Sequence, residues 1–148
     1  MAIKTKPDQY HNVTPYMIVA GADRLIDFLK AVFGGEETER LAGPAGTIGH
    51  AEVRIGDSLV MLADPGPQNP AFPAMLHIYV DDCDATYRKA LAAGGSSLRE
   101  PVNEFYGDRM SAVSDAFGNQ FWIATHVEDV SGEEMARRAQ ELATAAQP

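Results

Sequence analysis

The sequence predicts an α+β fold in which two βαβββ modules, with curled mixed sheets, enclose a cleft and are followed by a C-terminal helix. Residues 76–95 (LHIYVDDCDATYRKALAAGG) have the pattern of a strand, an acidic turn and an amphipathic helix that ends at two glycines. Residues 16–35 (YMIVAGADRLIDFLKAVFGG) follow the same plan, with Val19 61 residues before Val80 and Gly34 60 residues before Gly94. A Gly-Asp turn at 56–57 and a Gly-Asn turn at 118–119 each precede an apolar strand. Two such copies indicate one pseudo-symmetric domain over residues 1–148.

The first module is expected over residues 13–63, after a polar arm at 1–12. A strand at 13–19 precedes a helix that begins at the N-cap Asp23 and ends at Gly34-Gly35. Further strands are predicted at 37–41, 47–55 and 58–63. In the middle one, His50, Glu52 and Arg54 alternate with apolar residues, so the three ionisable side chains share one face.

Residues 64–73 (DPGPQNPAFP) contain four prolines, which predicts a linker between the modules. The second module then covers residues 74–126. Its predicted elements are a strand at 75–80, a helix at 84–93, and strands at 97–103, 109–114 and 120–125. A final helix at 131–147 begins with a capping box formed by Ser131 and Glu134.

The composition limits the binding partners, the covalent links and the membrane segments that we expect for this chain. The formal net charge is −9, which disfavours nucleic acid and anionic membrane surfaces and weakly favours a cationic ligand. Cys83 is the only cysteine, which excludes an internal disulfide and a cysteine-cluster metal site. There is no apolar leader and no run of about 18 apolar residues, so we expect a cytoplasmic protein with no membrane segment.

The repeated βαβββ unit and its Gly-Asp and Gly-Asn turns resemble the vicinal oxygen chelate superfamily. This group includes glyoxalase I, extradiol dioxygenases, and fosfomycin- and bleomycin-resistance proteins. The segments TPYMIV, HAEVRIGDSLVMLAD, VDDCDAT, FYGDR and DAFGNQFWIATHVEDVS look most like its PhnB-like branch. The resemblance covers residues 13–125 and implies a cleft between two modules, commonly in a homodimer.

In metal-dependent members of this family, the first and last strands of each module supply a His or Gln and a Glu as ligands. The corresponding positions here are Thr14, Val60, Met75 and Trp122, if the turns serve as anchors. None of these side chains is a credible ligand for a divalent transition metal. We therefore expect no metal and no cofactor at these positions.

The cleft is then expected to be an apolar pocket that binds a small molecule. Phe105, Tyr106 and Arg109, in the FYGDR block, are expected near its mouth, although Arg109 could instead bind a carboxylate of the protein. The complete set of expected ligand-binding residues is Tyr16, Ile18, His50, Glu52, Val60, Met75, His77, Tyr79, Phe105, Tyr106, Arg109 and Trp122.

Three functions remain open at this point. The first is a metal-independent protein that binds or sequesters a flat or aromatic small molecule, for example an antibiotic. The second is an enzyme of the lyase, isomerase or dioxygenase type that uses His50, Glu52 or His77 as acid or base, with or without a non-standard metal site. The third is a protein-interaction module that uses the C-terminal helix. We favour the first hypothesis; whether the protein is an enzyme stays open.

Overall fold

The computed structural model describes residues 2–147 and shows two βαβββ modules and a C-terminal helix. The first module consists of β1 (Tyr16–Ile18), α1 (Ala22–Phe33), β2 (Glu36–Ala42), the short 3-10 helix η1 (Pro44–Gly46), β3 (Ile48–Ile55) and β4 (Ser58–Ala63). The second consists of β5 (Met75–Tyr79), α2 (Cys83–Ala92), β6 (Ser96–Asn103), β7 (Asp108–Ser114) and β8 (Gln120–His126). Helix α3 (Gly132–Ala145) follows, capped by Ser131 as predicted. The predicted α+β fold class is confirmed.

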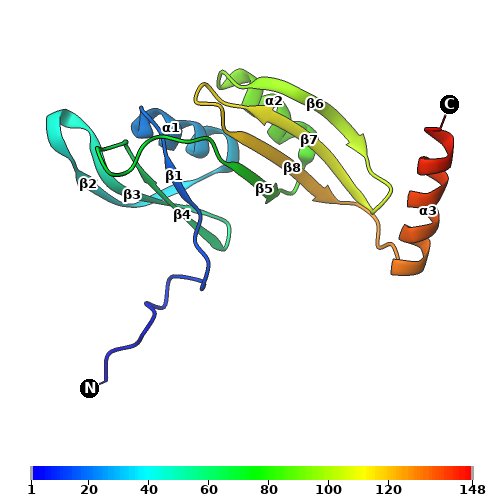
Figure 1. The fold of residues 1–148 in the computed structure, drawn as a ribbon, viewed down its shortest axis with the longest axis horizontal. Helices are drawn as coiled ribbons and strands as arrows, with labels where there is room; N and C mark the ends of the chain where they lie inside the picture. Colours follow the sequence, from blue (N-terminus) through cyan, green and yellow to red (C-terminus); the bar gives the residue numbers. More distant parts are fainter. Residues whose placement is uncertain (1, 148) are drawn as a thin grey trace.

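Each module forms its own four-stranded mixed sheet. The strand orders are β1-β4-β3-β2 and β5-β8-β7-β6, with β1 parallel to β4 and β5 parallel to β8. The two sheets lie next to each other and do not close into one barrel (Figure 1). The two sheets of the single chain stay open, and residues of both modules line the groove between them. Among residues 2–147, no helix combines the length and the apolar character needed to cross a bilayer.

The sheets stay apart because their apolar faces are used against the helices. Helices α1 and α2 pack on each other, and each also packs on the sheet of its own module. Phe121 on β8 contacts Phe28 and Phe33 on α1, with ring centroids 5.3 and 5.6 Å apart. Both modules thus bury one face of their sheet in one shared core. The opposite face of each sheet points outward, and we call it the open face.

The start of α1 is capped from a distance. Its N-cap is Gly21, whose φ of 117° favours glycine and which has no side chain to cap the helix. The carboxylate of Asp64, just after β4, accepts hydrogen bonds from the backbone N–H groups of Gly21 (2.8 Å), Ala22 (3.2 Å) and Ile48 (2.7 Å). The predicted N-cap, Asp23, instead lies in the first turn of the helix. Asp64 therefore joins β4, α1 and β3.

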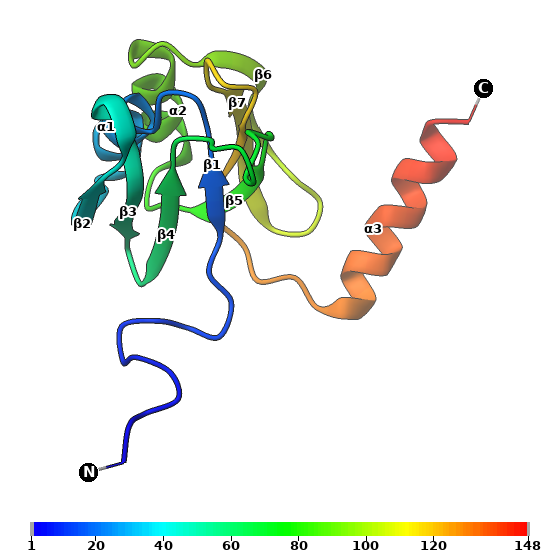
Figure 2. The ribbon, with the colours of Figure 1, turned by 60° about the vertical axis from the view of Figure 1, so that its left-hand side comes forward.

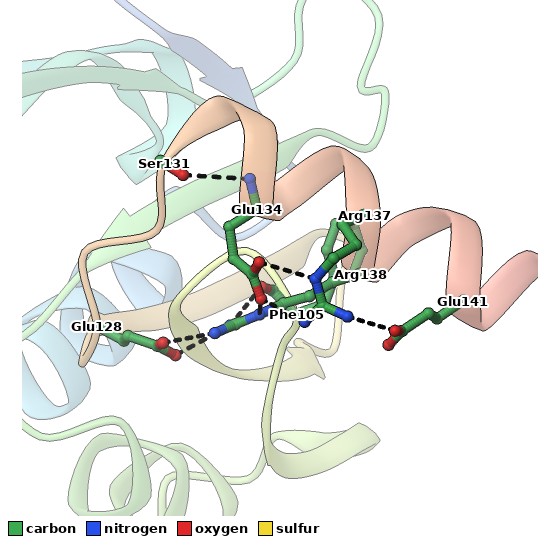
Figure 3. Close-up of polar contacts among 7 residues, drawn as sticks. All are labelled: Phe105, Glu128, Ser131, Glu134, Arg137, Arg138 and Glu141. Carbon is green, nitrogen blue, oxygen red and sulfur yellow. Dashed lines mark hydrogen bonds and ion pairs between the residues drawn. The ribbon is translucent and has the colours of Figure 1, made fainter.

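Helix α3 is held at its base and stands clear of both sheets (Figures 1 and 2). Arg138 donates hydrogen bonds to the backbone oxygen of Phe105 (3.1 Å) and to Glu128 (2.7 Å), as Figure 3 shows. The backbone oxygen of Gly107 accepts bonds from the N–H groups of residues 127 and 128. A Cβ at Gly107 would lie 2.1 Å from the backbone oxygen of Glu128, and its φ is 102°. Only glycine fits this approach.

The first prediction concerns Asp64. Replacing it with asparagine should lower the free energy of unfolding by about 1–3 kcal/mol at neutral pH, because charged hydrogen bonds to three backbone N–H groups are weakened. Burial raises the pKa of Asp64, but the three backbone bonds outweigh burial and hold that pKa below its ordinary value of 3.8. The stabilisation is therefore complete above pH 3.8 and is lost as pH falls through the lower native pKa.

Urea unfolding followed by circular dichroism measures this difference across the acid range. Asp27→Asn, on the exposed side of α1, is the matched control and should match the wild type at neutral pH. A gap between Asp64→Asn and wild type that stays constant down to strongly acid pH would contradict the ionised-carboxylate explanation.

The second prediction compares two glycines that both have positive φ. Gly107→Ala should lower the free energy of unfolding by several kcal/mol more than Gly46→Ala, because Gly46 (φ 77°) has nothing within 4 Å of an added Cβ. Backbone strain, on the order of 1–2 kcal/mol, is common to both variants and cancels in the comparison. Equal thermal stability of the two variants would show that the contact with Glu128 imposes no constraint.

Candidate functional site

The open face of the first sheet carries the ionisable residues that were predicted to lie together. Tyr16 on β1 and Glu52 on β3 are both Cα partners of Met61, on the strand between them. His50 precedes Glu52 by two residues and therefore points to the same face. Tyr16 and Glu52 therefore lie in the same row across the strands. His50 lies in the next row on the same face of the sheet.

These three side chains form a hydrogen-bonded chain, which we call the first-sheet network. The hydroxyl of Tyr16 lies 3.0 Å from His50 Nδ1, and His50 Nε2 lies 3.0 Å from Glu52 Oε2. Tyr10, from the N-terminal arm, donates its hydroxyl to the Glu52 carboxylate at 2.5 and 2.6 Å. Only 3% of Glu52 is exposed, so these partners are what satisfies its charge.

The pKa values within the first-sheet network follow from these contacts. Burial raises the pKa of Glu52, but the hydrogen bonds from Tyr10 and His50 outweigh burial, so the pKa is lower than normal. The same bond to Glu52 raises the pKa of Tyr10 to about 12. At neutral pH the network therefore holds an ionised carboxylate and a protonated phenol.

The second sheet has a related network at one end of its open face. The hydroxyl of Tyr79 donates to Asp108 Oδ2 (2.7 Å), and His126 Nδ1 lies 2.9 Å from Asp108 Oδ1. His126 Nε2 lies 2.7 Å from Asp129. Burial raises the pKa of Asp108, but the bonds from His126 and Tyr79 outweigh it and lower that pKa overall. The hydrogen bonds to Asp108 and Asp129 raise the pKa of His126.

Next to this network lies the aromatic face, which we define as Met75, His77, Tyr79 and Trp122. Met75 and Tyr79 are 60% and 62% exposed, although both are large and mainly apolar. The rings of His77 and Tyr79 lie 5.0 Å apart, and Trp122 is the Cα partner of His77 on the adjacent strand. Four of the expected ligand-binding residues are therefore neighbours on one exposed surface.

The structure has two hollows near these residues. The first, here called the linker pocket, has a volume of about 730 Å³ between β1, the loop before β3 and the linker after β4; Tyr16, Ile18 and Ile48 line it. The second, the inter-module groove, has a volume of about 640 Å³ along β5. Its lining includes His77, Tyr79 and the exposed acids Asp57, Asp81 and Asp82.

Two expected ligand-binding residues point toward the helices. Val60 is 3% exposed and belongs to the shared core, so the last-strand position opposite Trp122 is taken by Met61. The reason is the spacing: Tyr16 pairs with Met61 and His77 with Trp122, so the repeat is 61 residues there and not 62. Arg109 pairs with Asp84 on α2, at 2.6 and 3.1 Å.

The turn between β6 and β7 holds two further expected ligand-binding residues, Phe105 and Tyr106. The rings of Phe105 and Tyr106 meet edge to face, 5.3 Å apart, and both residues are partly buried. The backbone of Phe105 is bonded to Arg138 of α3 (Figure 3). This turn is therefore tied to the C-terminal helix.

The donor set at the positions where relatives bind a metal does not fit one. Thr14, Met75 and Trp122 offer no imidazole or carboxylate, and Met61 in place of Val60 offers only a thioether. Within the described residues, Glu39, His50 and Glu52 have ligand atoms within 4.8 Å of one another. Both oxygens of Glu52 already accept from Tyr10, however, and Glu39 is exposed.

The structure adds residues that sequence reasoning did not place in the site. Tyr10 belongs to the polar arm expected at residues 1–12, and Asp108 and His126 are not in the set of expected ligand-binding residues. The only sequence signal for Tyr10 was an aromatic residue in an otherwise polar segment, MAIKTKPDQYHN. The partners of Asp108 lie 29 and 18 residues away in sequence, so no local pattern could reveal them.

The comparisons with known proteins agree with this fold. Residues 10–123 match the model of the glyoxalase/bleomycin resistance protein/dioxygenase superfamily. An uncharacterized protein of Mycobacterium bovis is 32% identical over 146 residues, which cover 91% of this chain and 93% of the relative.

Solved structures with the same architecture are more distant in sequence. TioX from Micromonospora sp. ML1 superposes with a TM-score of 0.67 at 24% identity, over 79% of this chain and 99% of TioX. A protein of Bacillus cereus described as a putative 3-demethylubiquinone-9 3-methyltransferase, PhnB protein, gives 0.64 at 17% identity, over 78% and 99%. At these identities the likeness concerns the fold.

The third prediction concerns the arm. Tyr10→Phe should accelerate chymotrypsin cleavage after residue 10 by about 10-fold or more, because a hydrogen bond to a charged group contributes about 1.5–3 kcal/mol. Phenylalanine keeps the protease site, so only the attachment of the arm changes. Tyr79→Phe, which removes a hydroxyl bonded to the Asp108 carboxylate on the second sheet, is the control and should leave this rate unchanged. Equal cleavage rates in Tyr10→Phe and wild type would contradict attachment through Glu52.

Proposed function

The chain belongs to the glyoxalase/bleomycin resistance protein/dioxygenase superfamily, and from this premise we propose that it binds or sequesters a small aromatic molecule without a metal ion. We also propose that it belongs to the PhnB-like branch, which the FYGDR block and the Bacillus cereus structure support. The observation that carries the functional proposal is the exposed aromatic face on β5 and β8.

An exposed cluster of this kind points to a ligand. Large apolar side chains that gather on the surface of a folded chain mark binding sites more often than single exposed residues do. Met75 supplies a flexible thioether, His77 and Tyr79 supply rings at stacking distance, and Trp122 adds the largest ring. These side chains suit a flat ring system.

The acidic residues near the aromatic face indicate which charge the ligand should carry. Asp57, Asp81 and Asp82 lie along the inter-module groove that adjoins His77 and Tyr79. The chain as a whole has a formal net charge of −9. A cationic aromatic compound, such as a basic antibiotic, therefore meets a favourable field, and an anionic one is disfavoured.

A second copy of the chain would complete the site. The open faces of the two sheets do not meet within one chain, and relatives in this superfamily are commonly homodimers. We therefore place a homodimer in the proposal, with the aromatic face of one copy opposed by a sheet of its partner. Such an arrangement would remove Met75 and Tyr79 from water, which accounts for their exposure in the single chain.

The fourth prediction uses Trp122, the only tryptophan, as a reporter. At least one member of a panel of cationic aromatic antibiotics should quench its fluorescence in a saturable way, equally with and without a chelator. Tyr79→Ala should weaken binding about tenfold, as expected when a contact worth about 1.4 kcal/mol is removed.

The control is Leu98→Ala, an exposed apolar residue on β6 outside the aromatic face, and it should bind like the wild type. Absence of quenching by every compound, or unchanged affinity in Tyr79→Ala, would count against the proposal. Loss of binding on chelation would contradict its metal-independent part.

A further inference from the structure

A hydrogen-bonded chain leads from the linker pocket to a buried carboxylate. Tyr16 lines the pocket, and its hydroxyl lies 3.0 Å from His50 Nδ1. His50 Nε2 lies 3.0 Å from Glu52, which is 3% exposed. The order is the one found where an orienting carboxylate holds an imidazole that takes a proton from a hydroxyl.

The hydrogen-bond partners determine which atoms donate and which accept along Tyr16, His50 and Glu52. Glu52 is ionised and can only accept, so the proton of the neutral His50 ring lies on Nε2. His50 Nδ1 then carries a lone pair and accepts from the hydroxyl of Tyr16. The lone pairs of the Tyr16 oxygen remain available toward the pocket, where they can accept a hydrogen bond from a ligand.

Two carboxylates lie close to His50. Glu52 contacts it directly, and Glu39 on the neighbouring strand β2 has a carboxylate oxygen within 4.8 Å of the His50 and Glu52 ligand atoms. Tyr10, from the arm, donates to Glu52 and keeps its oxygens oriented. A positive charge on His50 is therefore matched by two carboxylates.

The linker pocket can hold a ring. Its volume of about 730 Å³ lies within the roughly 300–1,000 Å³ of small-molecule sites. Prolines 44, 65 and 67, with Ile18 and Ile48, give it apolar walls. The carboxylate of Asp64, which also lines it, is occupied by three backbone N–H groups.

We propose that Tyr16, His50 and Glu52 form a proton relay, and that the linker pocket binds a small molecule with a weakly acidic hydroxyl, a phenol or an enol, in its ionised form. The ligand O–H bond breaks and its proton passes to the Tyr16 oxygen, while the Tyr16 proton passes to His50 Nδ1. The products are a ligand oxyanion, which accepts a hydrogen bond from Tyr16, and an imidazolium held by Glu52. No oxidant or reductant is needed. This site lies on the first sheet and is independent of the aromatic face.

The test uses 4-nitrophenol, whose absorbance distinguishes the phenol from the phenolate. At a pH where the free probe is mostly un-ionised, wild-type protein should convert bound probe to phenolate, which lowers its apparent pKa. Tyr16→Phe and His50→Gln should each reduce the ionised fraction of bound probe about 10-fold or more. Tyr87→Phe, a hydroxyl deletion on α2 outside both the linker pocket and the aromatic face, should behave like the wild type.

A second measurement needs no substitution. Nitrogen-15 NMR of the wild-type histidine rings should show His50 changing from the neutral Nε2–H form to the doubly protonated form as the probe saturates. Failure of the probe to bind, a bound probe that stays un-ionised, a His50 ring that stays neutral, or full ionisation in Tyr16→Phe would each overturn the proposal. Quenching of Trp122 by the antibiotic panel should be unchanged in Tyr16→Phe, which separates this result from that of the aromatic face.

Discussion

The structure depends on the packing of both modules into one core between the two sheets. Phe121 of the second module fits against Phe28 and Phe33 of the first, and α1 lies against α2. Burial of these large side chains supplies most of the favourable free energy, at about 1.5–3 kcal/mol for each. The same packing commits most inner-face positions of the central strands to apolar residues. Each sheet carries its tyrosine–histidine–carboxylate network on the opposite, open face.

Strand periodicity carried most of the fold prediction, whereas counting residues from the turn glycines misplaced one position. Alternation correctly placed His50 and Glu52 on one face, because side chains two residues apart in a strand always share a face. The last-strand position was located by counting from turn glycines, which gave Val60. The first module has one residue more between its glycine and the paired position, so the true counterpart of Trp122 is Met61. A shift of one residue exchanges core and surface.

Contacts between segments that are far apart in the sequence could not be predicted from the sequence alone. The start of α1 offered Asp23 as a local cap, yet Gly21 occupies the cap and Asp64 supplies the acceptor from 43 residues away. Tyr10 reaches Glu52 over 42 residues, and no repeat or period marks it. By contrast, the Ser131 cap of α3 was predictable because its partner lies three residues ahead. A hydrogen bond between residues three or four positions apart can be recognised from their spacing in the sequence. A hydrogen bond between distant residues depends on the tertiary fold.

The two open faces show how a duplicated unit can keep its fold and diverge in chemistry. By strand register, Tyr16 corresponds to His77 and Ile18 corresponds to Tyr79. The tyrosine of the second module therefore lies two residues further along its strand than the tyrosine of the first. In the first module the tyrosine reaches a histidine that a buried Glu52 supports. In the second module it reaches the carboxylate of Asp108 directly, and the vacated position holds His77 beside Trp122. We propose a proton transfer on the first sheet and ring stacking on the second, although the inner faces of both sheets contribute to the same core.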